Sequence, residues 1–196
     1  MKKMLLILAL ALCGYANAQK GSVLVMGNVS YNSQKNSGFN SENKQNGFGI
    51  QPKIGYQFHE NWTAGIEGNF INVKQTSFEG SQYRDKVYGF GGFVRYSKPL
   101  GSIFSAYADL GVGYRNRKET FTSAVGQTYN DSNGFYASVT PAIFIDISKG
   151  FGLNFNIGGL NYSSLDSDSA TGSSYKTKTF GFNFGQSFSI GLSKNF

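Results

Sequence analysis

The chain has 196 residues, a formal net charge of +7 and only 40% hydrophobic residues, and this length allows one domain or two small ones. A single Cys excludes a disulfide framework and a cysteine-based zinc site, and a single His excludes a multi-histidine metal site. The mean hydropathy of -0.28 points toward a soluble protein, but an average conceals any alternation of apolar and polar residues.

The first eighteen residues have the pattern of an export signal. Two lysines precede an apolar run over residues 4–13, and the triplet Ala-Asn-Ala follows at 16–18. We expect cleavage between Ala18 and Gln19, which leaves residues 19–196 as one mature domain. The apolar run is too short to cross a bilayer as a helix.

The alternative for this segment is a lipoprotein signal that is acylated at Cys13. Leu12 disfavours it, because such signals carry a small residue immediately before the Cys. Cleavage after residue 18 removes this Cys and two positive charges from the mature chain. A Cys-free exported chain needs another source of stability, such as a closed sheet.

Eight segments then alternate apolar and polar residues with a period of two. Successive side chains of a strand point to opposite faces, so this alternation predicts strands with one apolar and one polar face. In the last segment, seven of the nine even positions are large and apolar, and all eight odd positions are Gly, Ser or Asn. The predicted strands cover residues 22–31, 48–58, 62–70, 88–96, 104–115, 135–148, 151–158 and 180–196.

The connections between these segments alternate in length, which predicts antiparallel neighbours. The short connections are residues 59–61, 97–102 and 148–150. The long connections are residues 32–47, 75–86, 116–134 and 163–178, and they are rich in Ser, Asn, Gly, Gln and Thr. This composition is typical of flexible loops.

Two architectures fit eight amphipathic strands: a soluble barrel with its apolar face inside, and a membrane barrel with that face against lipid. The small residues of the polar face suit the narrow lumen of an eight-stranded barrel. Segregated loop lengths and an export signal also favour the membrane. The sequence therefore predicts an all-β, eight-stranded antiparallel up-and-down transmembrane β-barrel with short periplasmic turns and long extracellular loops.

Aromatic residues mark both ends of the apolar faces, as they do at the two interfaces of membrane barrels. The row at the short-turn end consists of Tyr56, Phe58, Trp62, Tyr96, Phe104, Phe151 and Phe196. The row at the long-loop end consists of Tyr31, Phe48, Phe70, Tyr88, Tyr114, Phe135 and Phe180.

Pro52 and Pro141 fall in the middle of predicted strands, on the apolar face. Each lacks an N–H donor, and a closed barrel has no edge at which a missing donor would be harmless. We therefore expect a bulge or irregular pairing at each proline.

This pattern resembles the small outer-membrane β-barrel proteins of Gram-negative bacteria, of the OmpA/OmpX type, and in particular the outer membrane protein beta-barrel domain family. The most specific likeness is at the C-terminus, where Phe188, Ile190, Leu192 and Phe196 are similar to the strand signal that the outer-membrane assembly machinery recognises. The resemblance implies localisation in the cell outer membrane and contact with that machinery during biogenesis.

The polar faces of five consecutive predicted strands carry charges. These residues are Lys53, Glu67, Arg95, Asp109 and Asp146. Buried charges must pair, because an unpaired charge has a prohibitive desolvation cost. We interpret the set as an ion-pair plug that closes the lumen; a narrow polar channel lined by the same residues is the alternative.

The outer end of the predicted barrel has ten basic and seven acidic residues. Its candidate phosphate-binding residues are Lys74, Arg84, Lys86, Arg115, Arg117, Lys118, Lys176 and Lys178. One interpretation is contact with outer-membrane lipid and the phosphates of lipopolysaccharide; the other is an ordinary solvated loop surface. Export disfavours nucleic acid as a partner despite the basic pI.

The sequence favours a non-enzymatic role. Some eight-stranded outer-membrane barrels are lipid-modifying or lipid-cleaving enzymes that use a His with a Ser or an acid near the outer leaflet, whereas His59 lies in a predicted periplasmic turn. No G-x-S-x-G motif is present, and no cofactor or metal site is expected. We expect a structural or surface-interaction role, with Phe39, Phe78, Tyr83, Phe121 and Tyr129 as candidate contacts for an extracellular partner. A channel or carrier for small solutes or apolar ligands, and a soluble ligand-binding barrel, are the alternatives.

Overall fold

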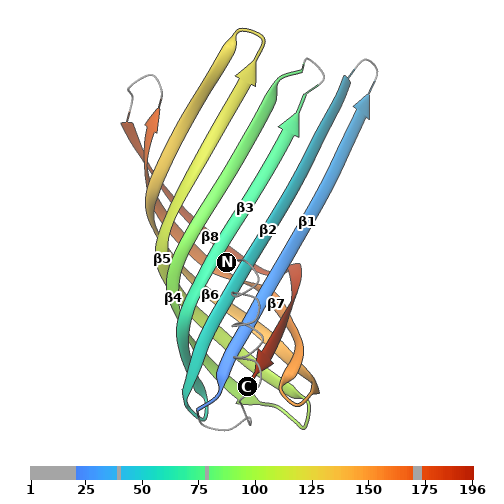
Figure 1. Cartoon of the computed structure of the whole chain (residues 1–196), viewed down its shortest axis with the longest axis vertical. Coiled ribbons are helices and arrows are strands. Elements are labelled where there is room, and N and C mark those ends of the chain that lie inside the picture. Colours follow the sequence, from blue (N-terminus) through green and yellow to red (C-terminus); the bar gives the residue numbers. More distant parts are fainter. Residues whose placement is uncertain (1–20, 39–40, 78–79, 170–173) are drawn as a thin grey trace, which may run out of the picture.

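Figure 1 shows the computed structural model, which describes residues 21–38, 41–77, 80–169 and 174–196. Eight antiparallel strands close into a barrel in sequence order, as predicted. Their bounds are β1 Val23–Gly38, β2 Ser41–His59, β3 Trp62–Thr76, β4 Gln82–Pro99, β5 Phe104–Ser123, β6 Gly126–Ser148, β7 Phe151–Ser169 and β8 Ser174–Asn195. Within these described ranges, no helix is long and apolar enough to cross a membrane. The predicted signal segment, Phe39 and Phe78 lie outside them.

The apolar faces of the strands point outward, and their large side chains form an exposed belt around the barrel. Aromatic residues of the two predicted rows lie on this belt and meet across neighbouring strands. The ring centroids of Trp62 and Tyr96 are 5.0 Å apart at the short-turn end. At the other end, those of Phe70 and Tyr88 are 6.3 Å apart. An apolar exterior of this kind is stable only against lipid or another apolar surface.

Phe196 departs from the predicted row, because its side chain is only 8% exposed. Its backbone exchanges two hydrogen bonds of 3.0 Å with Val23, which joins the C-terminus to the first strand. The ammonium group of Lys194 lies 5.6 Å from the centroid of the Phe196 ring. The last residue therefore takes part in barrel closure at the short-turn end.

The lumen holds apolar side chains as well as the predicted small polar ones. Leu24, Met26 and Phe93 are 3–4% exposed and form a small core inside the barrel. Asn154 is fully buried and donates to the Ser193 hydroxyl, 2.8 Å away. Side chains thus occupy the lumen of this part of the barrel, as expected for eight strands, and leave a cavity of about 230 Å³ beside Leu24 and Ser193.

Most residues of the predicted long loops belong to strands. The β5–β6 ladder continues outward to the pair Ser123–Gly126, and the β1–β2 ladder continues to Gly38–Ser41. The predicted strands were therefore too short at this end, because both faces of a strand in water can be polar. The alternation then disappears while the backbone ladder persists.

An irregularity in the ladder accompanies each mid-strand proline. The β2–β3 pairs pass from Ile50–Phe70 to Lys53–Glu67 and leave Pro52 unpaired on that side. The β6–β7 register shifts between Val139 and Ala142, the segment that contains Pro141. In both cases the other neighbouring strand pairs regularly with the proline. The break therefore falls on one side of the strand, as expected for a residue that lacks one N–H donor.

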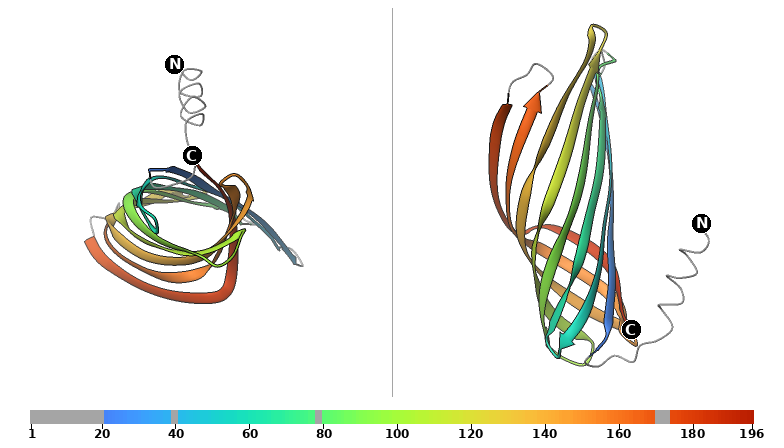
Figure 2. Two further views of the ribbon diagram at one scale, coloured as in Figure 1. Left: turned by 90° about the horizontal axis from the view of Figure 1, so that it is seen from below. Right: turned by 60° about the vertical axis from the view of Figure 1, so that its left-hand side comes forward.

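The closing contact between β1 and β8 is short. It consists of five residue pairs, from Leu24–Asn195 to Asn28–Gly191. The register of β7 against β8 shifts between Asn156 and Gly158. Beyond this point β8 separates from β1 and the β7–β8 hairpin bends outward, while β7 stays paired with β6 (Figure 2). The barrel is thus closed at the short-turn end and splayed at the end that carries the long hairpins.

Candidate functional site

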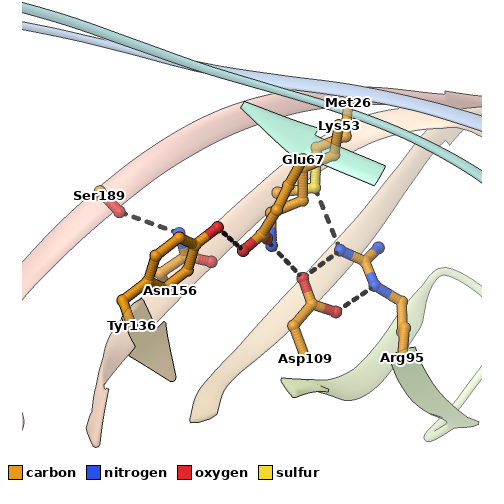
Figure 3. Close-up of polar contacts among 8 residues, drawn as sticks. All are labelled: Met26, Lys53, Glu67, Arg95, Asp109, Tyr136, Asn156 and Ser189. Atoms are coloured by element: carbon orange, nitrogen blue, oxygen red, sulfur yellow. Dashed lines mark hydrogen bonds and ion pairs between the residues drawn. The ribbon is translucent and has the colours of Figure 1, made fainter. Parts of the chain in front are cut away.

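Four of the five predicted lumen charges meet inside the barrel (Figure 3). Lys53 and Glu67 are directly opposite on β2 and β3, with Nζ and Oε2 2.8 Å apart. Arg95 and Asp109 are directly opposite on β4 and β5. The Lys53 ammonium also pairs with Asp109 Oδ2 at 2.9 Å, although β2 and β5 are not neighbours. This ion pair crosses the lumen and joins the two cross-strand pairs into one cluster.

Polar and aromatic side chains surround this cluster. The Tyr136 hydroxyl donates to Glu67 Oε1 at 2.8 Å, and Arg95 Nη2 donates to Met26 Sδ at 3.1 Å. The Arg95 guanidinium lies 3.7 Å from the centroid of the Tyr107 ring, and such a face is attractive to a cation. We call the four charged residues, together with Met26, Phe93, Tyr107 and Tyr136, the lumen plug.

The lumen plug is neutral, and its charged groups are buried or nearly so. It contains two cations and two anions, and Arg95 and Asp109 are 5% and 3% exposed. Every charged group in it has an oppositely charged partner within 3 Å, which offsets the cost of burial. A cavity of about 230 Å³ on the short-turn side contacts Arg95, and one of about 190 Å³ on the outer side contacts Lys53 and Glu67. The plug therefore stands between two separate spaces in the lumen.

Asp146 does not join the plug, contrary to the sequence interpretation. Both of its carboxylate oxygens accept from the backbone N–H of Gly150 at 3.2 Å. Gly150 and Lys149 have positive φ angles of 79° and 46° and form the β6–β7 turn. Asp146 lines the cavity on the short-turn side of Arg95, and its carboxylate stabilises the turn instead.

Sequence reasoning missed the uncharged members of the plug. Met26, Phe93, Tyr107 and Tyr136 occupy positions on the polar faces of their strands, where the alternation predicts polar residues. Large apolar side chains at these positions were the available signal, because they interrupt an otherwise regular pattern. They fill lumen space that Gly and Ser would leave empty.

A second polar cluster lies beyond the outer aromatic row and faces the axis of the barrel. Arg117 makes two hydrogen bonds of 3.0 Å to Asp85 and pairs with Glu119 at 3.1 Å. Tyr83 donates its hydroxyl to Glu119. Burial and this hydrogen bond raise the pKa of Tyr83 to about 12. Burial alone would raise the pKa of Glu119, but hydrogen bonds from Tyr83 and Asn130 lower it below its usual range.

The predicted outer-rim bases divide between two faces. Arg115 and Arg117 share the strand face of Asp109, so at the outer end of the barrel they point toward its axis and not toward lipid. The others share the faces of exposed belt aromatics and lie on the outer wall: Lys74, Arg84, Lys86, Lys118, Lys176 and Lys178. Lys118 pairs with Asp131 and Lys176 pairs with Asp166.

Two pairs of these outward bases face each other directly in the ladder. Lys74 is opposite Arg84, and Lys86 is opposite Lys118. Like charges directly opposite each other destabilise a strand pair. This arrangement concentrates positive charge on the wall formed by β3, β4 and β5.

Of the predicted assembly-signal residues, Ile190 and Leu192 point outward and are 57% and 52% exposed, while Phe196 is buried. The side chain of Phe188 lies outside the described part of the structure. His59 is exposed at the end of β2, on the short-turn side. It directly pairs with Trp62 across the β2–β3 turn.

The fold resembles solved bacterial barrels. The translocator domain of the autotransporter NalP from Neisseria meningitidis superposes with a TM-score of 0.50, at 16% identity over 99% of this chain and 76% of that one. Ail, the attachment invasion locus protein of Yersinia pestis, has a TM-score of 0.49 and 18% identity, with 91% of this chain and all of that one covered. Comparison with curated protein sequences found no match.

A family profile provides the assignment. The profile of the outer membrane protein beta-barrel domain matches residues 4–188, which is most of the chain. The closed antiparallel ring and its exposed apolar belt are the architecture that this description requires. The chain therefore belongs to the outer membrane protein beta-barrel domain family and is a protein of the cell outer membrane.

Proposed function

We propose that this protein is a non-enzymatic outer-membrane anchor that presents rigid extracellular hairpins to the envelope surface and to external partners. The observation that carries this proposal is the lumen plug, in which Arg95 and Asp109 are almost completely buried. A pore would need a hydrated path where these side chains and Tyr107 pack. The plug instead stabilises a closed cylinder, and the exposed hairpins are then the parts that face partners.

The β5–β6 hairpin is the clearest contact surface. Its ladder runs without a register shift from the outer aromatic pair Tyr114–Phe135 to the turn at Ser123–Gly126. Phe121 and Tyr129 on it are 47% and 62% exposed, and Val125 at the tip is 98% exposed. Apolar side chains on a regular ladder in water favour contact with another macromolecule. Phe121 faces the barrel axis directly opposite Tyr83, whose hydroxyl is already bonded to Glu119, whereas Tyr129 lies on the outward face.

In this role, the bases on the outer wall of the barrel bind the phosphates of lipopolysaccharide. Lys74, Arg84, Lys86 and Lys118 lie just beyond the outer aromatic row on three adjacent strands. A phosphate placed between two opposed bases would turn a repulsive pair into two charge-assisted hydrogen bonds. The side chains of Ile190 and Leu192 point outward, which supports recognition of the last strand by the assembly machinery.

Single-channel recording in planar bilayers tests the anchor proposal. The folded protein should give no steady unitary currents at moderate voltage. The variant Arg95→Ala/Asp109→Ala removes the buried centre of the plug and should conduct more than the wild type. Steady currents through the wild-type protein that change in the Arg95→Ala variant would establish the channel function in place of the anchor.

A further inference from the structure

We infer that the cavity on the outer side of the lumen plug binds a small hydroxylated carboxylate, of the sugar-acid class, with Arg115 as its anion-binding residue. This inference goes beyond the proposed anchor role. It rests on a partly buried guanidinium that has no ion-pair partner among the described residues, and on the polar groups that surround it.

Arg115 extends from β5 into the lumen, six residues beyond Asp109 on the same face. Its guanidinium lies 5.0 Å from the centroid of the Tyr136 ring. Its Nε atom is buried and has no hydrogen-bond partner among the residues that the structure describes. A desolvated guanidinium with an unused donor is costly unless an acceptor occupies the space beside it.

The nearby carboxylates are already engaged. Glu67 accepts from Tyr136 through Oε1 and pairs with Lys53 through Oε2. Asp85 binds Arg117 through both of its oxygens. Glu119 pairs with Arg117, so none of the three carboxylates around the cavities forms an ion pair with Arg115 within the described residues. The space beside it is therefore suited to a negatively charged group.

Two cavities, of about 190 and 310 Å³, share Arg115, Asn161 and Ser163 in their walls. The rest of the lining is rich in amide and hydroxyl side chains, among them Gln51, Asn69, Ser138, Thr140, Thr177 and Thr179. Asn69 Oδ1 is a buried acceptor without a partner and would take a hydrogen bond from a ligand hydroxyl.

These features together specify the ligand class. One carboxylate meets the Arg115 guanidinium, in the planar geometry that suits this pair. Several hydroxyl groups meet the amides and hydroxyls of the wall. An apolar ligand would leave these wall groups desolvated and unpaired, which disfavours the carriage of apolar molecules through this space.

Isothermal titration calorimetry on the folded protein in detergent micelles tests the site, with D-gluconate as the probe. D-glucose has the hydroxyls without the charge, and acetate has the charge without the hydroxyls. Gluconate should bind saturably, and glucose and acetate should each bind roughly tenfold more weakly or worse. Absence of saturable gluconate binding, or equal binding of acetate, would overturn the inference.

The variant Arg115→Gln should reduce gluconate affinity roughly tenfold or more. The matched control Arg84→Gln removes the same charge from the outer wall and should leave the affinity unchanged. Heat-modifiable migration in SDS verifies that both variants are folded. Gluconate should raise the unfolding temperature of the wild type and of Arg84→Gln but not of Arg115→Gln. Unchanged gluconate affinity in folded Arg115→Gln would refute the assignment.

Discussion

Arg95 and Asp109 face each other across the β4–β5 ladder and are joined by two parallel hydrogen bonds, 2.7 Å from Nε to Oδ1 and 2.9 Å from Nη2 to Oδ2. Asp109 Oδ2 also accepts from Lys53, 2.9 Å away. One carboxylate therefore pairs with two cations that come from different strands, β2 and β4. This makes Asp109 the centre of the lumen plug and the residue whose loss has the largest expected effect.

The substitution Asp109→Asn should destabilise the barrel by about 3–5 kcal/mol, because it leaves Arg95 buried without its counter-ion. Urea unfolding in detergent micelles or lipid vesicles measures the change. The control is Asp166→Asn, which breaks an ion pair with Lys176 at a side chain that is 66% exposed. That change should cost less than about 1 kcal/mol. Equal losses in the two variants would contradict the central role of Asp109.

Removal of both partners should be better tolerated than removal of one. The double variant Arg95→Met/Asp109→Leu replaces the pair by apolar side chains and leaves Lys53 paired with Glu67. We expect it to be more stable than the single variant Asp109→Leu by roughly 2 kcal/mol or more, because no uncompensated charge then stays buried. A double-mutant cycle from urea unfolding gives the coupling between the two residues. Additive effects would show that they do not act as a pair.

Because of Tyr83, the stability of the outer hairpins should depend on pH in the alkaline range. Burial and the contact with Glu119 raise its pKa from 10.0 to about 12. In the folded protein the phenol stays protonated while an unfolded Tyr ionises. Its contribution to stability is therefore complete below about pH 10 and is lost as the pH rises through about 12.

A difference titration of tyrosinate absorbance between the wild type and Tyr83→Phe isolates this group. In the Glu119→Gln background the same difference should appear at lower pH, because the hydrogen bond to the carboxylate and the repulsion from it are lost. A Tyr83 transition at the ordinary tyrosine pKa in the wild-type protein would show that the contact with Glu119 does not form in solution.

Gly158 should be intolerant of any side chain. Its φ is 103°, and an added Cβ would lie 2.3 Å from the backbone oxygen of Asn183. The substitution Gly158→Ala should destabilise the protein by about 1–3 kcal/mol from backbone strain, with a further cost from the clash. In the control Gly101→Ala the new Cβ meets nothing within 4 Å. Urea unfolding should separate the two, and a neutral Gly158→Ala would contradict the bend in β7.

The basic wall on β3–β5 should respond to the charge of the lipid. Vesicles that contain lipopolysaccharide should raise the unfolding temperature relative to neutral phosphatidylcholine vesicles, because phosphates relieve the opposed bases. The variant Arg84→Glu/Lys86→Glu should lose most of this increment. Lys178→Glu is the control, since it reverses a charge on β8 opposite Ser164. A similar loss in the control would indicate general attraction by net charge.

The faces of the strands follow from the sequence alone. Alternation is a local property of an extended backbone, so Phe180, Phe182 and Phe184 lie on one face wherever the strand is placed. All three are exposed on the outer belt. The same reasoning placed Lys53, Glu67, Arg95 and Asp109 on the polar face of their strands. It also located the ladder irregularities near Pro52 and Pro141, because a missing N–H is a property of the residue itself.

Which charges meet was decided only by the closed barrel. Lys53 reaches Asp109 from a strand that is not its neighbour, and this distance depends on the stagger and closure of all eight strands. The same stagger places Asp146 at a turn and leaves Arg115 beside a cavity. The length of the outer hairpins could not be predicted from the alternation of apolar and polar residues. Where both faces of a strand lie in water, both can be polar, and the alternation ends although the backbone ladder continues. Local chemistry therefore determined the orientation of the side chains, and the tertiary structure determined their partners.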